Sequence, residues 1–203
     1  MTSTADWPKE APMRYANRLA AFVCLVVPLA LTRGALAQDT PPRSWTQIGA
    51  TGVLDESSAP VRFGSNGAVA VGVSAAAPAR AVLRYNITAV NGLFASQASG
   101  ENLPLCLHLR YRDTGADARV VVRIKRASFG PQPGEPDVHT LITFDSNSRP
   151  YLEGREYVWA TVCSPDLAFG FYESAYFAEV ELWRLQPGGD PGLHALGIRL
   201  DFQ

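Results

Sequence analysis

Two segments in the middle of the chain alternate between apolar and polar residues, and this alternation constrains the fold more than any other feature. The apolar positions are Leu105, Leu107, Leu109, Tyr111, Val120, Val122 and Ile124. Between them lie His108, Arg110, Arg112, Arg119, Arg123 and Lys125. A period of two is typical of a β-strand with one buried face. Because only residues 113–117 separate the segments, we predict a β-hairpin with one apolar and one cationic face.

Further short strands, separated by turn-forming residues, are expected along the rest of the chain. The candidates are residues 45–53, 61–63, 68–74, 81–90, 138–145, 156–163, 175–185 and 194–202. No segment has an apolar period of 3.6 over three turns, which argues against helices. The sequence therefore predicts an all-β fold, a single antiparallel β-sandwich of about nine strands over residues 45–203. Both a jelly-roll and an immunoglobulin-like topology are compatible with this pattern.

The amino-terminal residues 1–37 have the pattern of a secretory signal peptide. An apolar run at 19–31 follows two arginines and precedes the small-residue motif that ends at Ala37. The run is too short for an ordinary transmembrane helix. We expect cleavage after Ala37, a flexible entry at 38–44, no stable membrane span in the mature chain, and a secreted or periplasmic location. Met13 is an alternative start, since it would give a leader of the usual short, cationic kind.

Two cysteines remain in the predicted mature chain, Cys106 and Cys163. Export would place them where disulfides persist, so we predict a bridge between them. Neither cysteine has the Cys-x-x-Cys spacing of a redox site. Each lies on the side of its strand opposite to the aliphatic residues, which predicts a bridge on the outer side or rim of one sheet, with the two strands as neighbours.

The cationic residues are the first candidate binding site. We single out Arg110, Arg112, Arg119 and Arg123, because forked guanidinium groups bind carboxylate, sulfate and phosphate groups. An anionic glycan would suit them. The alternative is that these side chains are solvated and paired with acidic residues of neighbouring strands. The acidic candidates for such pairs are Asp113, Asp117, Glu179 and Glu181.

Aromatic residues provide a second candidate site. Tyr157, Trp159, Phe177 and Trp183 lie opposite the aliphatic residues of their strands. If they are exposed, Trp159 and Trp183 offer flat surfaces on which sugar rings can stack, and a neutral glycan becomes a candidate ligand. The alternative is that these rings fill the core of the sandwich.

Evidence for catalysis, a metal or a cofactor is weak. The sequence has none of the common nucleophile, zinc-protease or phosphate-loop motifs. Its three histidines are scattered over three strands, so we predict no metal, cofactor or catalytic residues. Glu179 and Glu181 share one strand face about 7 Å apart, a spacing that a glycosidase can use. A formal net charge of −1 gives no reason to expect a nucleic-acid partner.

Together these features favour a secreted, non-catalytic binding, adhesion or structural module of the cell envelope, with glycans among its candidate ligands. Two alternatives remain open. One is a small outer-membrane β-barrel, since the mature length suits eight strands. The other is a carbohydrate-active hydrolase that uses a carboxylate pair.

Overall fold

The computed structural model describes residues 44–88, 104–129, 137–149, 156–164 and 169–200, and the predicted leader lies outside them. All described residues belong to one compact unit. The strands are β1 Ser44–Ile48, β2 Val53–Leu54, β3 Val61–Phe63, β4 Val69–Val71, β5 Ala79–Ile87, β6 Leu105–Arg112, β7 Ala118–Ser128, β8 Asp137–Asp145, β9 Val158–Ser164, β10 Ser174–Arg184 and β11 Gly192–Leu200. The first of these begins inside the segment that was expected to be a flexible entry.

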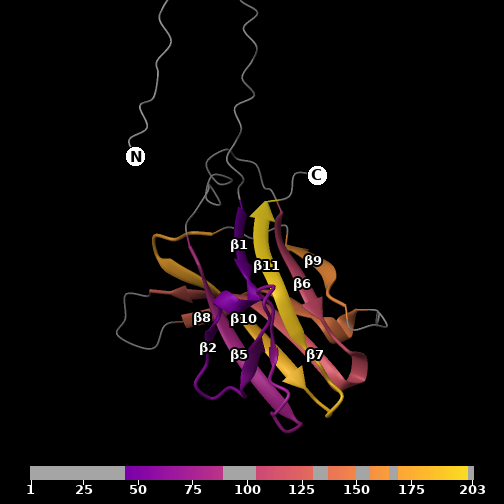
Figure 1. Ribbon diagram of the computed structural model, residues 1–203. Helices are drawn as coiled ribbons and strands as arrows, with labels where there is room; N and C mark the ends of the chain where they lie inside the picture. The colour runs from indigo at the N-terminus through magenta and orange to yellow at the C-terminus, as the bar shows by residue number, and fades with distance from the viewer. Residues whose placement is uncertain (1–43, 89–103, 130–136, 150–155, 165–168, 201–203) are drawn as a thin grey trace, which may run out of the picture. The chain divides into compact units, whose positions relative to one another are not determined.

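These strands form two antiparallel sheets (Figure 1). Sheet A has the order β3-β4-β11-β6-β9, with β1 also paired to β11, and sheet B has the order β2-β5-β10-β7-β8. The prediction of an antiparallel β-sandwich is confirmed. Because the described strands belong to two sheets, the alternative of one closed eight-stranded sheet is wrong.

The strand pairing decides between the two topologies that the sequence left open. The pairs are β4 with β11, β5 with β10, β6 with β9, and β7 with β8. This is the pairing of one long hairpin folded over on itself, with each arm crossing from sheet to sheet as it advances. An eight-stranded hairpin folded in this way is a jelly roll.

The prediction of a hairpin across residues 104–126 is wrong. β6 lies in sheet A and β7 in sheet B, so the two strands face each other instead of pairing side by side. A short 3-10 turn at Gly115–Asp117 makes the crossing, and Gly115 adopts a positive φ of 82° that suits glycine. Consequently the cationic side chains of the two strands point away from the core in opposite directions.

The core lies between the sheets and is filled by the alternating residues found in the sequence. Leu105, Leu107 and Leu109 of β6 are completely buried, as are Val120, Val122 and Ile124 of β7. Tyr111 of β6 packs edge-on against Phe144 of β8 across the two sheets, with 4.9 Å between ring centroids. Each strand of the central pairs therefore has one face in the core and one face available for function.

Within the part of the chain that the structure describes, no helix has the length and apolar character that a membrane crossing requires.

Candidate binding groove on sheet A

Three successive cross-strand pairs join β6 to β9 on the outer face of sheet A, and a contact between an arginine and a tyrosine follows them. The cysteines of the first pair, Cys106 and Cys163, form a disulfide with a Cα–Cα distance of 4.0 Å. In the second pair, His108 Nδ1 and Thr161 Oγ1 are hydrogen bonded at 2.9 Å. In the third pair, Arg110 Cζ lies 5.9 Å from the Trp159 ring centroid. Next to it, Arg112 Cζ lies 4.9 Å from the ring centroid of Tyr157, the residue that precedes β9.

The predicted disulfide is confirmed, together with its place in the fold. Cys106 and Cys163 are direct partners in the β6–β9 register, so the two strands are neighbours in one sheet. The leucines on either side of Cys106 point into the core, which puts the bridge on the outer face. It therefore fixes the register of the strands that carry Arg110 and Trp159.

A groove of about 820 Å³ runs over this face beside the three pairs. We call it the Trp159 groove. It is lined by Ser44, Thr46, Gln47 and Ile48 of β1, by Ala195, Leu196, Gly197, Ile198 and Arg199 of β11, and by His108, Trp159 and Thr161. Four adjacent strands, in the order β1, β11, β6 and β9, span it, and these lie side by side in Figure 1. At the usual strand spacing its walls are about 14 Å apart.

The shape of the groove follows from the sizes of its residues. Ala195 and Gly197 of the central strand β11 have almost no side chain, so they form a low floor. A Cβ atom at Gly197 would lie 3.2 Å from Thr46 Cγ2, which leaves little room for a larger residue. On the two walls Ile48 is 47% exposed and Trp159 is 68% exposed. A solvent-exposed tryptophan on a rigid strand beside a hollow is typical of a binding surface.

A second, smaller hollow of about 230 Å³ continues on the same face and is bordered by Arg62, Arg112 and Tyr157. Arg62 and Arg112 share one carboxylate, that of Asp190, at 2.7 and 2.9 Å. Burial raises the pKa of the Tyr157 phenol above its ordinary value, so this group stays neutral. Arg110 lies on β6 between the residue that lines the Trp159 groove, His108, and the one that borders the smaller hollow, Arg112.

The structure separates the six candidate residues into two sets. Arg110, Arg112 and Trp159 lie together on the outer face of sheet A, whereas Arg119, Arg123 and Trp183 lie on the outer face of sheet B. In sheet B, Arg119 Nε donates to Asp145 at 3.0 Å, and Arg123 is paired with Glu181. Trp183 lies under Arg80 and donates its indole N–H to Glu181 at 2.8 Å. A single cationic face therefore does not form.

Glu179 and Glu181 are at the centre of a network of ion pairs on sheet B. Although they lie on the outer face, they are only 8% and 6% exposed, because basic side chains of β5 and β7 cover them. Lys125 binds Glu179 at 2.6 Å, and Arg80 binds Glu181 at 2.9 Å. On the outer face of sheet B, the basic side chains are therefore paired with acidic residues of neighbouring strands, as the alternative to a binding site predicted.

This network also bears on the hydrolase alternative. Burial alone would raise the pKa of Glu181, but the hydrogen bonds that it accepts from Arg80, Arg123 and Trp183 outweigh burial and hold the pKa below its ordinary value. A glycosidase needs one carboxyl that stays protonated to act as the general acid. Glu181 lacks this property.

We expect Glu181→Gln to lower the free energy of unfolding by about 1–3 kcal/mol at neutral pH, because two arginines lose their shared carboxylate. The folded-state pKa of Glu181 is lower than the unfolded one, so its contribution is complete above about pH 4.3 and is lost as the pH falls through the folded value. The difference between parent and variant should therefore shrink in acid. Urea unfolding at pH 7 and below pH 4 measures it.

The exposed Glu56 lies outside the network, and Glu56→Gln is the matched control, with an expected change within about 0.5 kcal/mol at both pH values. A Glu181→Gln effect that is the same in acid as at neutral pH would contradict the ion-pair explanation.

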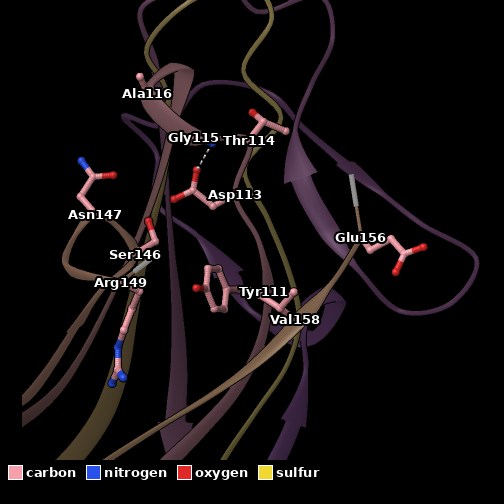
Figure 2. Close-up of a pocket in the computed structure, with 10 residues that line it drawn as sticks. All are labelled: Tyr111, Asp113, Thr114, Gly115, Ala116, Ser146, Asn147, Arg149, Glu156 and Val158. Atoms are coloured by element: carbon pink, nitrogen blue, oxygen red, sulfur yellow. Dashed lines mark hydrogen bonds between the residues drawn. The ribbon is translucent and has the colours of Figure 1, made fainter. Parts of the chain in front are cut away.

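A polar cavity of about 720 Å³ lies at one end of the sandwich (Figure 2). Asp113 is its half-buried carboxylate, and it accepts a hydrogen bond from Gly115 N at 2.9 Å. Burial is the main cause that raises the pKa of Asp113, and the nearby Asp145 adds to it. In Figure 2 the side chains of Arg149 and Glu156 point away from Asp113. The described residues contain no group of three or more His, Cys, Asp or Glu that could hold a metal ion.

Sequence reasoning found Arg110 and Trp159 but missed the other half of the groove. Thr46, Ile48 and Gly197 come together only because β1 pairs with β11, whose sequence lies about 150 residues away. The one available signal was the outward parity of Ala195 and Gly197 in the last strand. Two such small residues on an outer face leave a depression between larger neighbours.

No protein-family model matches the chain, and no curated protein sequence matches it. Among solved structures, it is similar to the K1 cleaved adhesin domain of Lys-gingipain from Porphyromonas gingivalis W83, with a TM-score of 0.39, 10% identity, and coverage of 78% of this chain and 99% of that one. It is also similar to the carbohydrate recognition domain of Emp47p, with a TM-score of 0.35, 8% identity, and coverage of 80% and 90%.

A family two carbohydrate esterase from Cellvibrio japonicus is similar with a TM-score of 0.34 and 10% identity over 78% of this chain. The chain spans 34% of the length of that esterase. With TM-scores below 0.5, these similarities assign neither a ligand nor an activity to this chain.

Proposed function

We propose that this protein is a non-catalytic glycan-binding module that acts outside the cytoplasm, and that the Trp159 groove is its binding site. The observation that carries the proposal is the Trp159 side chain, 68% exposed beside a groove of about 820 Å³. Leaving so much of an indole ring in water costs free energy, and a ligand that covers it recovers that cost.

The chemistry around the ring suits a sugar. The apolar ring can cover the flat face of a pyranose, while hydroxyl and imidazole groups within the groove can bind its hydroxyl groups. Thr46, His108 and Thr161 supply such groups. A groove across four strands is also long enough for more than one sugar residue.

Rigidity supports the same proposal. The ring lies on β9, which is hydrogen bonded to β6 throughout Leu105–Tyr111 and linked to it by the Cys106–Cys163 disulfide. A preformed site loses less conformational entropy when it binds. The disulfide also favours an extracytoplasmic location, because such bridges persist in oxidising compartments.

We expect Trp159→Ala to weaken binding of a glycan by about tenfold to a hundredfold, as is usual when an anchoring aromatic side chain is removed. The purified protein would first be applied to an array of neutral and acidic glycans to find a ligand, and the affinities would then be measured by calorimetry. Thermal unfolding should change little, because the ring contributes to a surface and not to the core.

The matched control is Trp183→Ala, which removes a tryptophan from the opposite face of the sandwich. This variant should bind the glycan as the parent does. Unchanged binding by the Trp159 variant, or loss of binding by the Trp183 variant alone, would place the site elsewhere and contradict the proposal.

A further inference from the structure

The two outer faces of the sandwich differ in how their positive charges are balanced. On sheet B every cation singled out above has a carboxylate partner: Arg119 pairs with Asp145, Arg123 with Glu181, and Lys125 with Glu179. On sheet A, Arg62 and Arg112 share the single carboxylate of Asp190. Among the described residues, the outer face of sheet A therefore keeps an excess of positive charge.

Arg110 is the centre of this excess. It forms no ion pair with any of the described residues, and its Cζ atom lies 5.9 Å from the centroid of the Trp159 ring. Its Nε atom is buried and lacks a hydrogen-bond acceptor in the described structure. A charged group with unsatisfied donors beside a groove is costly without a ligand, and an anion of the ligand would satisfy it.

The position of Arg110 fits a ligand that touches both partners. It lies opposite Trp159 in the β6–β9 register, so a sugar ring that covers the indole would bring its substituents close to the guanidinium. Arg112 follows two residues later on the same face, about 7 Å along the strand. The forked guanidinium can donate two parallel hydrogen bonds to two oxygen atoms of a carboxylate or sulfate group, and neutral hydroxyl groups accept such bonds less strongly.

The excess of positive charge on the outer face of sheet A is local and does not reflect the net charge of the whole chain. The whole sequence carries a formal charge of −1, and the ion pairs of sheet B compensate one another. A positive region on an otherwise slightly negative protein attracts anionic ligands selectively.

We propose that the Trp159 groove selects acidic glycans, and that Arg110 binds the anionic group of a sugar residue that stacks on Trp159. This inference rests on the proposed glycan-binding function and adds the class of ligand to it. It also assigns different roles to the two residues of one cross-strand pair: Trp159 binds the ring of the sugar, and Arg110 recognises its charge.

The experiment compares an oligogalacturonate with its methyl ester, since esterification removes the charge and keeps the sugar backbone. Calorimetry with the purified parent should give an affinity for the acid form at least about tenfold higher, the effect of one charge-assisted hydrogen-bonded pair. Arg110→Gln should reduce this preference to less than about threefold while keeping affinity for the ester. Trp159→Ala should weaken binding of both forms.

Arg80→Gln is the matched control, because Arg80 lies 5.0 Å from the ring of Trp183 on the opposite face and copies the local geometry of Arg110. This variant should keep both affinities. Raising the salt concentration should weaken binding of the acid form more than that of the ester. A sulfated neutral oligosaccharide distinguishes the source of the charge: binding that depends on Arg110 supports recognition of anions in general, and binding of the uronate alone supports a carboxylate.

Two results would overturn the inference without affecting the glycan-binding function. One is equal affinity of the parent for the acid and the ester. The other is a preference for the acid that survives in Arg110→Gln. If the parent binds no glycan on the array and neither of these two forms, both the inference and the proposed function fail.

Discussion

Replacement of Arg184 with methionine is expected to lower the free energy of unfolding by about 3–5 kcal/mol, a large part of the stability of an ordinary domain. Arg184 is the last residue of β10 and is only 5% exposed. Its guanidinium donates to four backbone carbonyl groups: Gly189 O at 2.8 Å, Gly72 O at 2.7 Å, and Ala75 O and Val71 O at 3.2 Å each. A methionine has no donor for these carbonyl groups, so all four hydrogen bonds would be lost.

The large expected effect comes from what Arg184 joins. Its side chain starts in sheet B and reaches Val71, the last residue of β4 in sheet A, and the connection that follows it. It also holds the turn that leads from β10 into β11. One side chain thus links both sheets and two connections at one end of the sandwich.

Urea unfolding of parent and variants tests this expectation. If the methionine variant does not fold, Arg184→Lys remains measurable, because lysine keeps the charge but donates fewer hydrogen bonds in a different geometry; we expect a loss of about 1–3 kcal/mol. Arg84→Gln is the control, since Arg84 is half exposed and pairs with Asp55 at the surface. A loss below about 1 kcal/mol in Arg184→Met would refute the structural role of the arginine.

The sequence contained a signal for Arg184, although not for its partners. Tyr176, Ala178, Val180 and Leu182 point into the core, and Arg184 has the same parity. An arginine that continues an inward row needs buried acceptors. Three of the four acceptors belong to residues 71–75, more than 100 positions away, and a pattern with a period of two contains no information about them.

The same limit explains the wrong hairpin. Alternation shows that β6 and β7 each have one apolar face, and this condition is met equally by two strands side by side and by two strands that face each other across a core. A connection of five residues, 113–117, can make either arrangement, because about 10 Å separates packed sheets. Only the partners of each strand, β9 and β8, distinguish the two cases.

The cysteine pair was predictable because its parity had a physical consequence. A bridge through the core would have drawn Arg110 into the interior, where its charge would lack a partner, so an outer bridge between neighbouring strands was favoured. The structure confirms that choice. The groove beside it was only half predictable, since Thr46 and Ile48 have no feature that marks them until β1 and β11 are paired.

The second large effect is expected from removal of the disulfide by Cys106→Ser together with Cys163→Ser. The bridge closes a loop over a sequence separation of 57 residues, and loss of this constraint on the unfolded chain should lower the free energy of unfolding by about 2–4 kcal/mol. The fold should persist, because the hydrogen bonds of β6 with β9 and with β11 remain.

The double variant also separates stability from binding. Cys106–Cys163 lies two positions from the His108–Thr161 pair and four from the Arg110–Trp159 pair, so the register of the binding pairs depends on it only in part. We expect glycan affinity to fall by less than about tenfold at temperatures where the variant is folded, since the ladder of backbone hydrogen bonds still aligns the strands.

Urea unfolding of the parent with and without a reducing agent, beside the double variant without it, measures the contribution of the bridge. The reduced parent and the variant should unfold at similar urea concentrations, both below that of the oxidised parent. Because a thiol and a hydroxyl differ little in size, the comparison isolates the covalent link. A double variant as stable as the oxidised parent would mean that the β6–β9 pairing already restricts the unfolded chain, and the entropic explanation of the disulfide would then be wrong.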